Sequence, residues 1–131
     1  MTARCLQDFA GEWHFTRHIL HDDGTHADVT GQVRFDPVPG GLAYVETGEM
    51  VLNGATLTTQ RRYLWADGLR VYFEDGRFFH TVPALGGAAA HWCDPDQYDV
   101  AYDFGNWPDW HSSWTVKGPR KSYQMYSRYH R

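Results

Sequence analysis

The stretch LAYVETGEMVLNGATLTTQRRYLW, residues 42–65, predicts a long β-hairpin with its turn at Asn53-Gly54. Asn-Gly is a strong signal for a two-residue turn, because both central positions need a positive φ that these residues tolerate. The turn sets Leu52 opposite Ala55 and thereby determines the pairs that follow. The face with the larger apolar groups is expected to point inward, and its pairs are Met50:Leu57, Gly48:Thr59, Glu46:Arg61, Tyr44:Tyr63 and Leu42:Trp65.

Turn signals of this kind recur along the chain and separate short runs of alternating or β-favouring residues. We expect ten strands, at about residues 12–20, 27–36, 41–52, 55–65, 69–74, 77–82, 88–93, 97–104, 109–117 and 120–130. Only residues 3–10 favour a helical turn. A meander of this length closes most readily into a barrel, because closure removes unpaired strand edges. The predicted fold is therefore all-β, a single up-and-down antiparallel β-barrel that forms one domain over residues 1–131.

Three other turns set the remaining registers. As a two-residue turn, Asp75-Gly76 directs Phe79 outward and gives the inward pairs Phe73:Phe78, Val71:His80 and Leu69:Val82. Gly118-Pro119, read the same way, gives Trp114:Tyr123, Ser112:Met125 and Trp110:Ser127, and a longer loop would shift these pairs. A four-residue loop over 94–97 gives the pairs Cys93:Tyr98 and His91:Val100.

The composition narrows the classes of partner. The net charge is −4 at pH 7 and no basic stripe is present, so a nucleic-acid partner is not expected. No apolar run has the length of a membrane span, and MTARCLQDFAG at the N-terminus lacks the apolar core of a signal peptide. We therefore expect no membrane partner and a cytoplasmic location, with Cys5 and Cys93 as reduced thiols. Aromatic residues make up 16% of the chain, enough to line a cavity as well as fill a core.

Several polar side chains occupy inward positions where the alternation would place hydrophobic residues. Burying a charge is costly unless it is paired, so a core built only for stability would avoid Arg17, Glu46 and Arg61. Glu46 opposite Arg61 predicts either an ion pair that lines a pocket or a partly solvated pair at the barrel mouth. The candidate ligand-binding residues are Arg17, Tyr44, Glu46, Arg61, Tyr63, His80, His91, Tyr98, Tyr102, Trp110, Trp114 and Tyr123.

His80, His91 and Cys93 also occupy inward positions and are the candidates for a metal site. Their spacing matches no strong zinc signature. The prediction is therefore no metal and no cofactor, with both histidines hydrogen-bonded to tyrosines and Cys93 packed as a small hydrophobic group.

Three functions compete for this interior. The leading hypothesis is non-enzymatic binding of a small apolar or aromatic ligand whose carboxylate or phenolate meets Arg61, with Arg17 as a second candidate. In this hypothesis His80 and a tyrosine supply hydrogen bonds to the ligand. The second is a small enzyme of the lyase, cyclase or isomerase type, with His80 or Glu46 as the base, Tyr63 or Tyr102 as the acid and Arg61 as the anchor. The third is haem binding through His80 or His91. Outward aromatic residues are candidates for a homodimer patch, namely Tyr72, Phe79, Trp92 and Tyr126.

The motif Gly11-Glu12-Trp13, after a short apolar turn and at the start of the first strand, resembles the opening of lipocalin-like (calycin) barrels. The resemblance implies that Trp13 plugs the closed end of the barrel and that an arginine at the end of the last strand packs over it. Arg131 faces inward by strand parity, and Arg128 is the other candidate.

A broader resemblance runs through five segments: RRYLW (61–65), FEDGRFFH (73–80), YDVAYDF (98–104), WPDWHSSW (107–114) and VKGPRKSY (116–123). They are similar to those of an uncharacterised family of short bacterial proteins of unknown function. This resemblance implies a compact bacterial β-barrel and supplies no mechanism.

Overall fold

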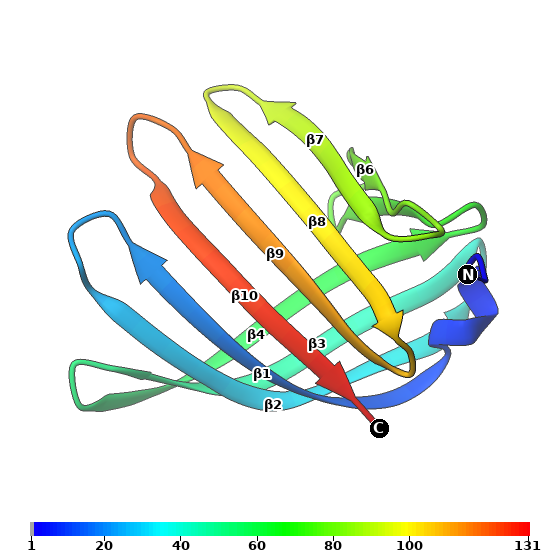
Figure 1. Ribbon diagram of the computed structural model, residues 1–131, viewed down its shortest axis with the longest axis horizontal. Coiled ribbons are helices and arrows are strands. Elements are labelled where there is room, and N and C mark those ends of the chain that lie inside the picture. The colour runs from blue at the N-terminus through cyan, green and yellow to red at the C-terminus, as the bar shows by residue number, and fades with distance from the viewer. Residues whose placement is uncertain (1) are drawn as a thin grey trace.

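The computed structural model of the chain describes residues 2–131 and shows ten antiparallel strands with one short helical turn (Figure 1). The elements are η1 (Leu6–Phe9), β1 (Gly11–His21), β2 (His26–Val38), β3 (Gly41–Leu52), β4 (Ala55–Ala66), β5 (Arg70–Phe73), β6 (Phe78–Thr81), β7 (Gly87–Cys93), β8 (Asp96–Asn106), β9 (Asp109–Lys117) and β10 (Ser122–His130). The predicted all-β class is confirmed, and every strand boundary lies within two residues of the expected one. Among the described residues, no helix is long and apolar enough to cross a membrane.

The strands form one nearly closed barrel. Sequence neighbours pair from β1 to β6 and from β7 to β10, and β1 also pairs with β10. In Figure 1 the β1–β2, β3–β4, β7–β8 and β9–β10 hairpin tips spread apart at the left, whereas both chain termini lie at the right. We call the left end the mouth and the right end the closed end.

One seam of the barrel stays open, because β6 and β7 are the two ends of the sheet and do not pair. β5 pairs with β4 only over Tyr63–Ala66, which leaves residues 55–62 of β4 with a free edge in the described part of the chain. β7 presents a second free edge over its whole length. We call this opening between β4–β6 and β7 the seam.

The closed end is built as the lipocalin-like resemblance implies. Trp13 is 1% exposed, and its indole Nε1 donates a hydrogen bond to the carbonyl of Phe9 at 2.8 Å. The guanidinium carbon of Arg131 lies 4.0 Å from the centre of the Trp13 ring, and Arg131 Nη2 donates to two backbone carbonyls of the N-terminal segment. Arg131, not Arg128, therefore covers the tryptophan.

Aromatic rings fill the barrel above this floor. Phe9 is fully buried, and its ring centroid lies 5.1–5.8 Å from those of Phe35, Trp65, Phe104, Trp107 and Trp110. Trp110 in turn stacks on Tyr129 at 3.9 Å. The closed half of the barrel is therefore a solid hydrophobic core.

The register predicted from Asn53-Gly54 is confirmed at every pair between β3 and β4. Two other hairpins keep the predicted faces but are displaced by two residues. Tyr98 pairs with His91 rather than with Cys93, and Trp114 pairs with Met125 rather than with Tyr123. A displacement of two residues leaves each side chain on the same face of the sheet, so the inward sets survive the error.

The loop lengths account for both displacements, because residues 94–95 alone join β7 to β8 and residues 118–121 join β9 to β10, and the two loops meet at a buried acid. Asp96 is buried at the start of β8, where it pairs with Cys93 and lies 3.5 Å from the ammonium of Lys121. Gly118 packs so closely against the Asp96 carboxylate that a Cβ there would overlap it. The longer loop after β9 thus wraps around Asp96, which a two-residue turn at Gly118-Pro119 would not allow.

The β5–β6 hairpin departs from the predicted alternation. Tyr72 pairs with Phe78, Val71 pairs with His80, and Phe79 is the extra residue of a β-bulge between them. Phe78 is therefore 46% exposed, whereas Phe79 is buried and stacks on Phe73 at 4.5 Å. The prediction that Phe78 points inward and Phe79 outward is wrong, because the bulge places Phe79 and His80 both inside.

Candidate functional site

A layer of charged side chains crosses the barrel above the aromatic core. Arg17 of β1 donates to both carboxylate oxygens of Glu46 on β3, each at 2.7 Å, and its Nε donates to the Ser127 hydroxyl of β10 at 2.7 Å. The Tyr44 hydroxyl donates to Glu46 Oε1 at 2.5 Å and lies 3.1 Å from the hydroxyl of Tyr129. Arg17 and Glu46 are both buried, and the hydrogen bonds of this ion pair are made within the protein.

Two glycines make room for the Phe15 ring, on which Arg17 packs. Gly31 and Gly48 pair directly on β2 and β3, and a Cβ on either would come within 3.0–3.1 Å of the Phe15 ring. Phe15 therefore lies against bare backbone, and the Arg17 guanidinium stacks over its ring at 4.7 Å.

The electrostatics of the pair follow from its burial. Burial alone would raise the pKa of the Glu46 carboxyl, but the hydrogen bonds from Arg17 and Tyr44 together lower it below its ordinary value. Burial raises the pKa of Tyr44 well above 10, so the hydroxyl stays protonated. The carboxylate is thus permanently charged at neutral pH and committed to Arg17.

Arg61 lies beside the Arg17–Glu46 pair and makes only a long contact with the Glu46 carboxylate. It is the cross-strand neighbour of Glu46, as predicted, but its Nε lies 4.0 Å from Oε2 and its side chain is 32% exposed. The predicted Glu46–Arg61 pair is therefore secondary, because Arg17 holds both carboxylate oxygens. Two guanidinium groups and one carboxylate give the layer a net charge of +1, and the excess lies on Arg61, whose guanidinium is 5.7 Å from the Trp114 ring centre.

His80 closes the layer on the seam side. It is 2% exposed, its Nε2 lies 2.8 Å from the Tyr102 hydroxyl, and its Nδ1 has no hydrogen-bond partner in the described structure. Burial, with a smaller contribution from the charge of His91, lowers the pKa of His80 to about 4. The indole Nε1 of Trp110, 1% exposed, also lacks a partner.

These groups surround one small cavity of about 30 Å³. At roughly 10–15 Å³ for each water molecule, it holds about two waters. Of the predicted ligand-binding residues, those that line it are Arg17, Tyr44, Glu46, Arg61, Tyr63, His80, Tyr102, Trp110 and Trp114. Aromatic side chains occupy most of the barrel interior, so the cavity that these residues line is small.

Three predicted residues lie outside this lining. His91, Tyr98 and Tyr123 face inward nearer the mouth, where the Lys121 ammonium donates to the Tyr98 hydroxyl at 3.4 Å. In the described part of the chain, no group of three or more candidate ligands is arranged to hold a metal ion. His80 meets a tyrosine, as predicted. The same prediction is wrong for His91, which makes no side-chain hydrogen bond to a tyrosine among residues 2–131 and packs 5.5 Å from the Phe79 ring instead.

The prediction omitted six residues that line the cavity: Trp65, Val71, Phe79, Ser112, Met125 and Tyr129. Strand alternation places most of these side chains on the inner face of the barrel, so the sequence pattern could have identified them. Phe79 is different, because only the bulge turns it inward.

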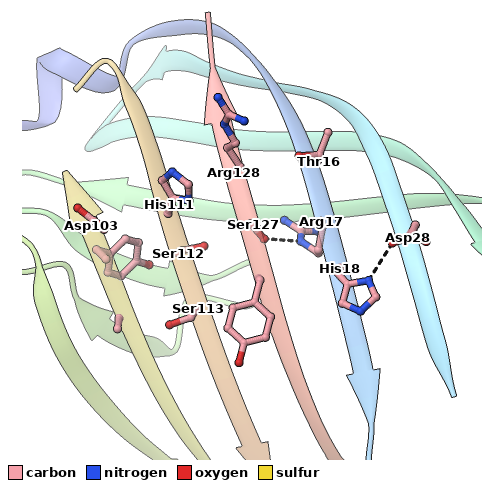
Figure 2. Close-up of a pocket in the computed structure, with 13 residues that line it drawn as sticks. Thr16, Arg17, His18, Asp28, Asp103, His111, Ser112, Ser113, Ser127 and Arg128 are labelled. Carbon is pink, nitrogen blue, oxygen red and sulfur yellow. Dashed lines mark hydrogen bonds and ion pairs between the residues drawn. The ribbon is translucent and has the colours of Figure 1, made fainter. Parts of the chain in front are cut away.

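A second hollow, of about 420 Å³, lies on the outer face of β1, β10, β9 and β8 (Figure 2). His18 bonds to Asp28 at 2.8 Å there, and Thr16, His111 and Arg128 surround the hollow from neighbouring strands. The His18 and Asp28 side chains are 46% and 74% exposed, which is typical of a solvated polar face. The buried, aromatic-lined cavity is the stronger candidate site.

Fold and interior together define a lipocalin-like barrel with a charged layer across its core. Residues 9–131 match a family of unknown function (DUF6314), and the chain belongs to that family. No curated protein sequence matches the chain. Among solved structures, the S-type phycobiliprotein lyase CPES from Guillardia theta is similar, with a TM-score of 0.62 and 9% identity over 95% of this chain and 87% of that one. At this identity the likeness shows the fold alone.

Proposed function

We propose that the protein binds a small aromatic or apolar anion in the barrel interior, with its carboxylate or phenolate on Arg61. The observation that carries the proposal is the unequal sharing of Glu46: Arg17 holds both oxygens at 2.7 Å, and Arg61 reaches one at 4.0 Å. Arg61 therefore keeps guanidinium donors for an anion. The likeness to a phycobiliprotein lyase agrees with uptake of a small molecule by a barrel of this shape.

Such a ligand needs more space than a cavity of about 30 Å³. The wall that can yield is the β5–β6 hairpin, because it has no strand partner on the side of the seam. An open groove of about 460 Å³ outside the barrel shares Arg61 and Tyr63 with the cavity. We place ligand entry there, with Phe79 moving away from Trp114, whose ring centre is now 5.3 Å away.

The pKa directions favour binding over acid–base catalysis. A general base works best with a pKa near the working pH, but the pKa of His80 is about 4 and that of Glu46 is lowered. The candidate acids, Tyr63 and Tyr102, have pKa values raised above 10 by burial, so they are weak proton donors. At neutral pH the layer presents fixed charges and hydrogen-bond donors, which suits recognition of an anion.

Haem binding is less well supported by the same geometry. An axial histidine needs a nitrogen accessible to iron, and His80 is buried with its Nε2 engaged by Tyr102. His91 is more accessible, so haem titration of the purified protein, read as a Soret band, tests this alternative directly.

An aromatic sulfonate, 8-anilinonaphthalene-1-sulfonate, tests the main proposal by fluorescence titration. We expect saturable binding, weakened about tenfold or more by Arg61→Gln, because a charge-assisted hydrogen bond is lost. Arg34→Gln is the matched control, since Arg34 lies exposed on the outer face and pairs with Asp36. Unchanged binding by the folded Arg61 variant, or no binding by the folded wild-type protein, would refute the proposal.

A further inference from the structure

The hydrogen bond between His80 and Tyr102 determines which histidine nitrogen carries the proton. The Tyr102 hydroxyl has a single partner among residues 2–131, which is Nε2 of His80 at 2.8 Å. A buried hydroxyl whose O–H has no acceptor is unfavourable, so the Tyr102 hydroxyl donates its hydrogen bond and His80 Nε2 accepts it. The neutral imidazole must then carry its proton on Nδ1.

With this tautomer, two of the residues that line the cavity hold buried donors without a partner. His80 Nδ1–H is unpartnered, and so is Trp110 Nε1–H, which has no acceptor capacity. Both residues are at least 98% buried and line the same cavity as Arg61. A buried donor without a partner is unfavourable, so a ligand oxygen that accepts from it strengthens binding.

We infer that the ligand carries a second acceptor oxygen, a ketone or similar carbonyl, which binds at His80 while its carboxylate binds at Arg61. The ligand class is thus an aromatic oxo-carboxylic acid rather than a simple hydrophobic acid. This inference rests on the proposed function, because it takes the Arg61 anchor as given.

Two pairs of matched probes separate the carbonyl from the rest of the ligand. 4-Acetylbenzoate is compared with 4-isopropenylbenzoate, in which a CH₂ group replaces the ketone oxygen, and 4-benzoylbenzoate with 4-benzylbenzoate. We expect the folded wild-type protein to bind the ketone about tenfold more tightly in at least one pair, by calorimetry. The preference should fall to about one in His80→Phe, with the affinity for the carbonyl-free probe retained.

His80→Phe strands the Tyr102 hydroxyl, so the double variant H80F/Y102F provides a second test with no orphaned group at this contact. Long-range ¹⁵N spectra of histidine-labelled wild-type protein give an independent reading, with Nδ1 protonated as the expected result. Equal binding within both pairs, or a proton on Nε2, overturns the inference and leaves the Arg61 anchor standing. If no probe of either kind binds, the proposed function fails instead.

Discussion

At the scale of single residues, the surroundings of a buried side chain determine its protonation state. His80 is the clearest case, because a bulge of one residue turns it and Phe79 into the core together. Surrounded by Phe79 and Tyr102, the imidazole stays neutral over most of the pH range. It therefore contributes to stability as a neutral group and loses that contribution when protonated.

The stability of the protein should depend on pH through His80. Its pKa falls from an ordinary 6.5 to about 4 in the folded state, so the unfolded chain binds a proton first as the pH falls. The contribution is complete above pH 6.5 and is lost between that pH and about 4, with a total of about 3 kcal/mol. Urea titrations at a series of pH values measure it, and His80→Phe should flatten this part of the profile. A profile that is equally steep in the variant would assign the effect to another group.

At the scale of elements, the charged layer joins β1 to β3, which is not its neighbour in the sheet, and to β10, which is. Arg17 of β1 bonds to Glu46 of β3 across β2, and to Ser127 of β10. Such a pair contributes little net stability compared with a hydrophobic replacement, but breaking it leaves a buried charge without a partner. The Arg17–Glu46 ion pair thus places Arg61 next to a carboxylate whose two oxygens already accept hydrogen bonds from Arg17.

Glu46→Gln should therefore be strongly destabilising, by about 3–5 kcal/mol, because Arg17 is left buried and unpaired. The double variant R17M/E46M should recover most of that loss, since it removes both charges. Urea unfolding followed by tryptophan fluorescence compares the three proteins. A cost below about 1 kcal/mol for the single variant would mean that water reaches Arg17.

At the scale of the whole molecule, the barrel is closed by β1 and β10 and open at the seam. The β1–β10 pairing lies in the middle of the strand order, whereas β6 and β7 are its unpaired ends, so flexibility is expected at the seam. Backbone groups on a free edge are bonded to water rather than to a neighbouring strand.

Hydrogen exchange should reveal this asymmetry. Amides of β7 that point to the seam should exchange much faster than amides shared by β1 and β10, which are paired over eight positions. Exchange measured by NMR resolves the two groups, and the β1–β10 amides are the internal control. Strong protection along the β7 edge would contradict an open seam and would point to a partner strand, as in a homodimer.

Much of the architecture was predictable because its causes are local. Asn53-Gly54 needs only its own backbone preferences to set the β3–β4 register, and alternation then sorts side chains to two faces. The errors come from side-chain contacts that strand alternation does not contain. The loop at Gly118 packs on Asp96, and the stacking of Phe79 on Phe73 accompanies the bulge.

The sequence by itself determined the strand count, the inward faces, the tryptophan plug and the presence of Arg17, Glu46, Arg61 and His80 inside the barrel. Only the tertiary structure decided that Glu46 belongs to Arg17, that Arg61 approaches it only to 4.0 Å, and that the cavity measures about 30 Å³. The physical reason is the distance along the chain over which each kind of interaction acts. Turn chemistry and strand periodicity act over a few residues, whereas ion pairing and packing depend on how strands far apart in the chain meet across the barrel.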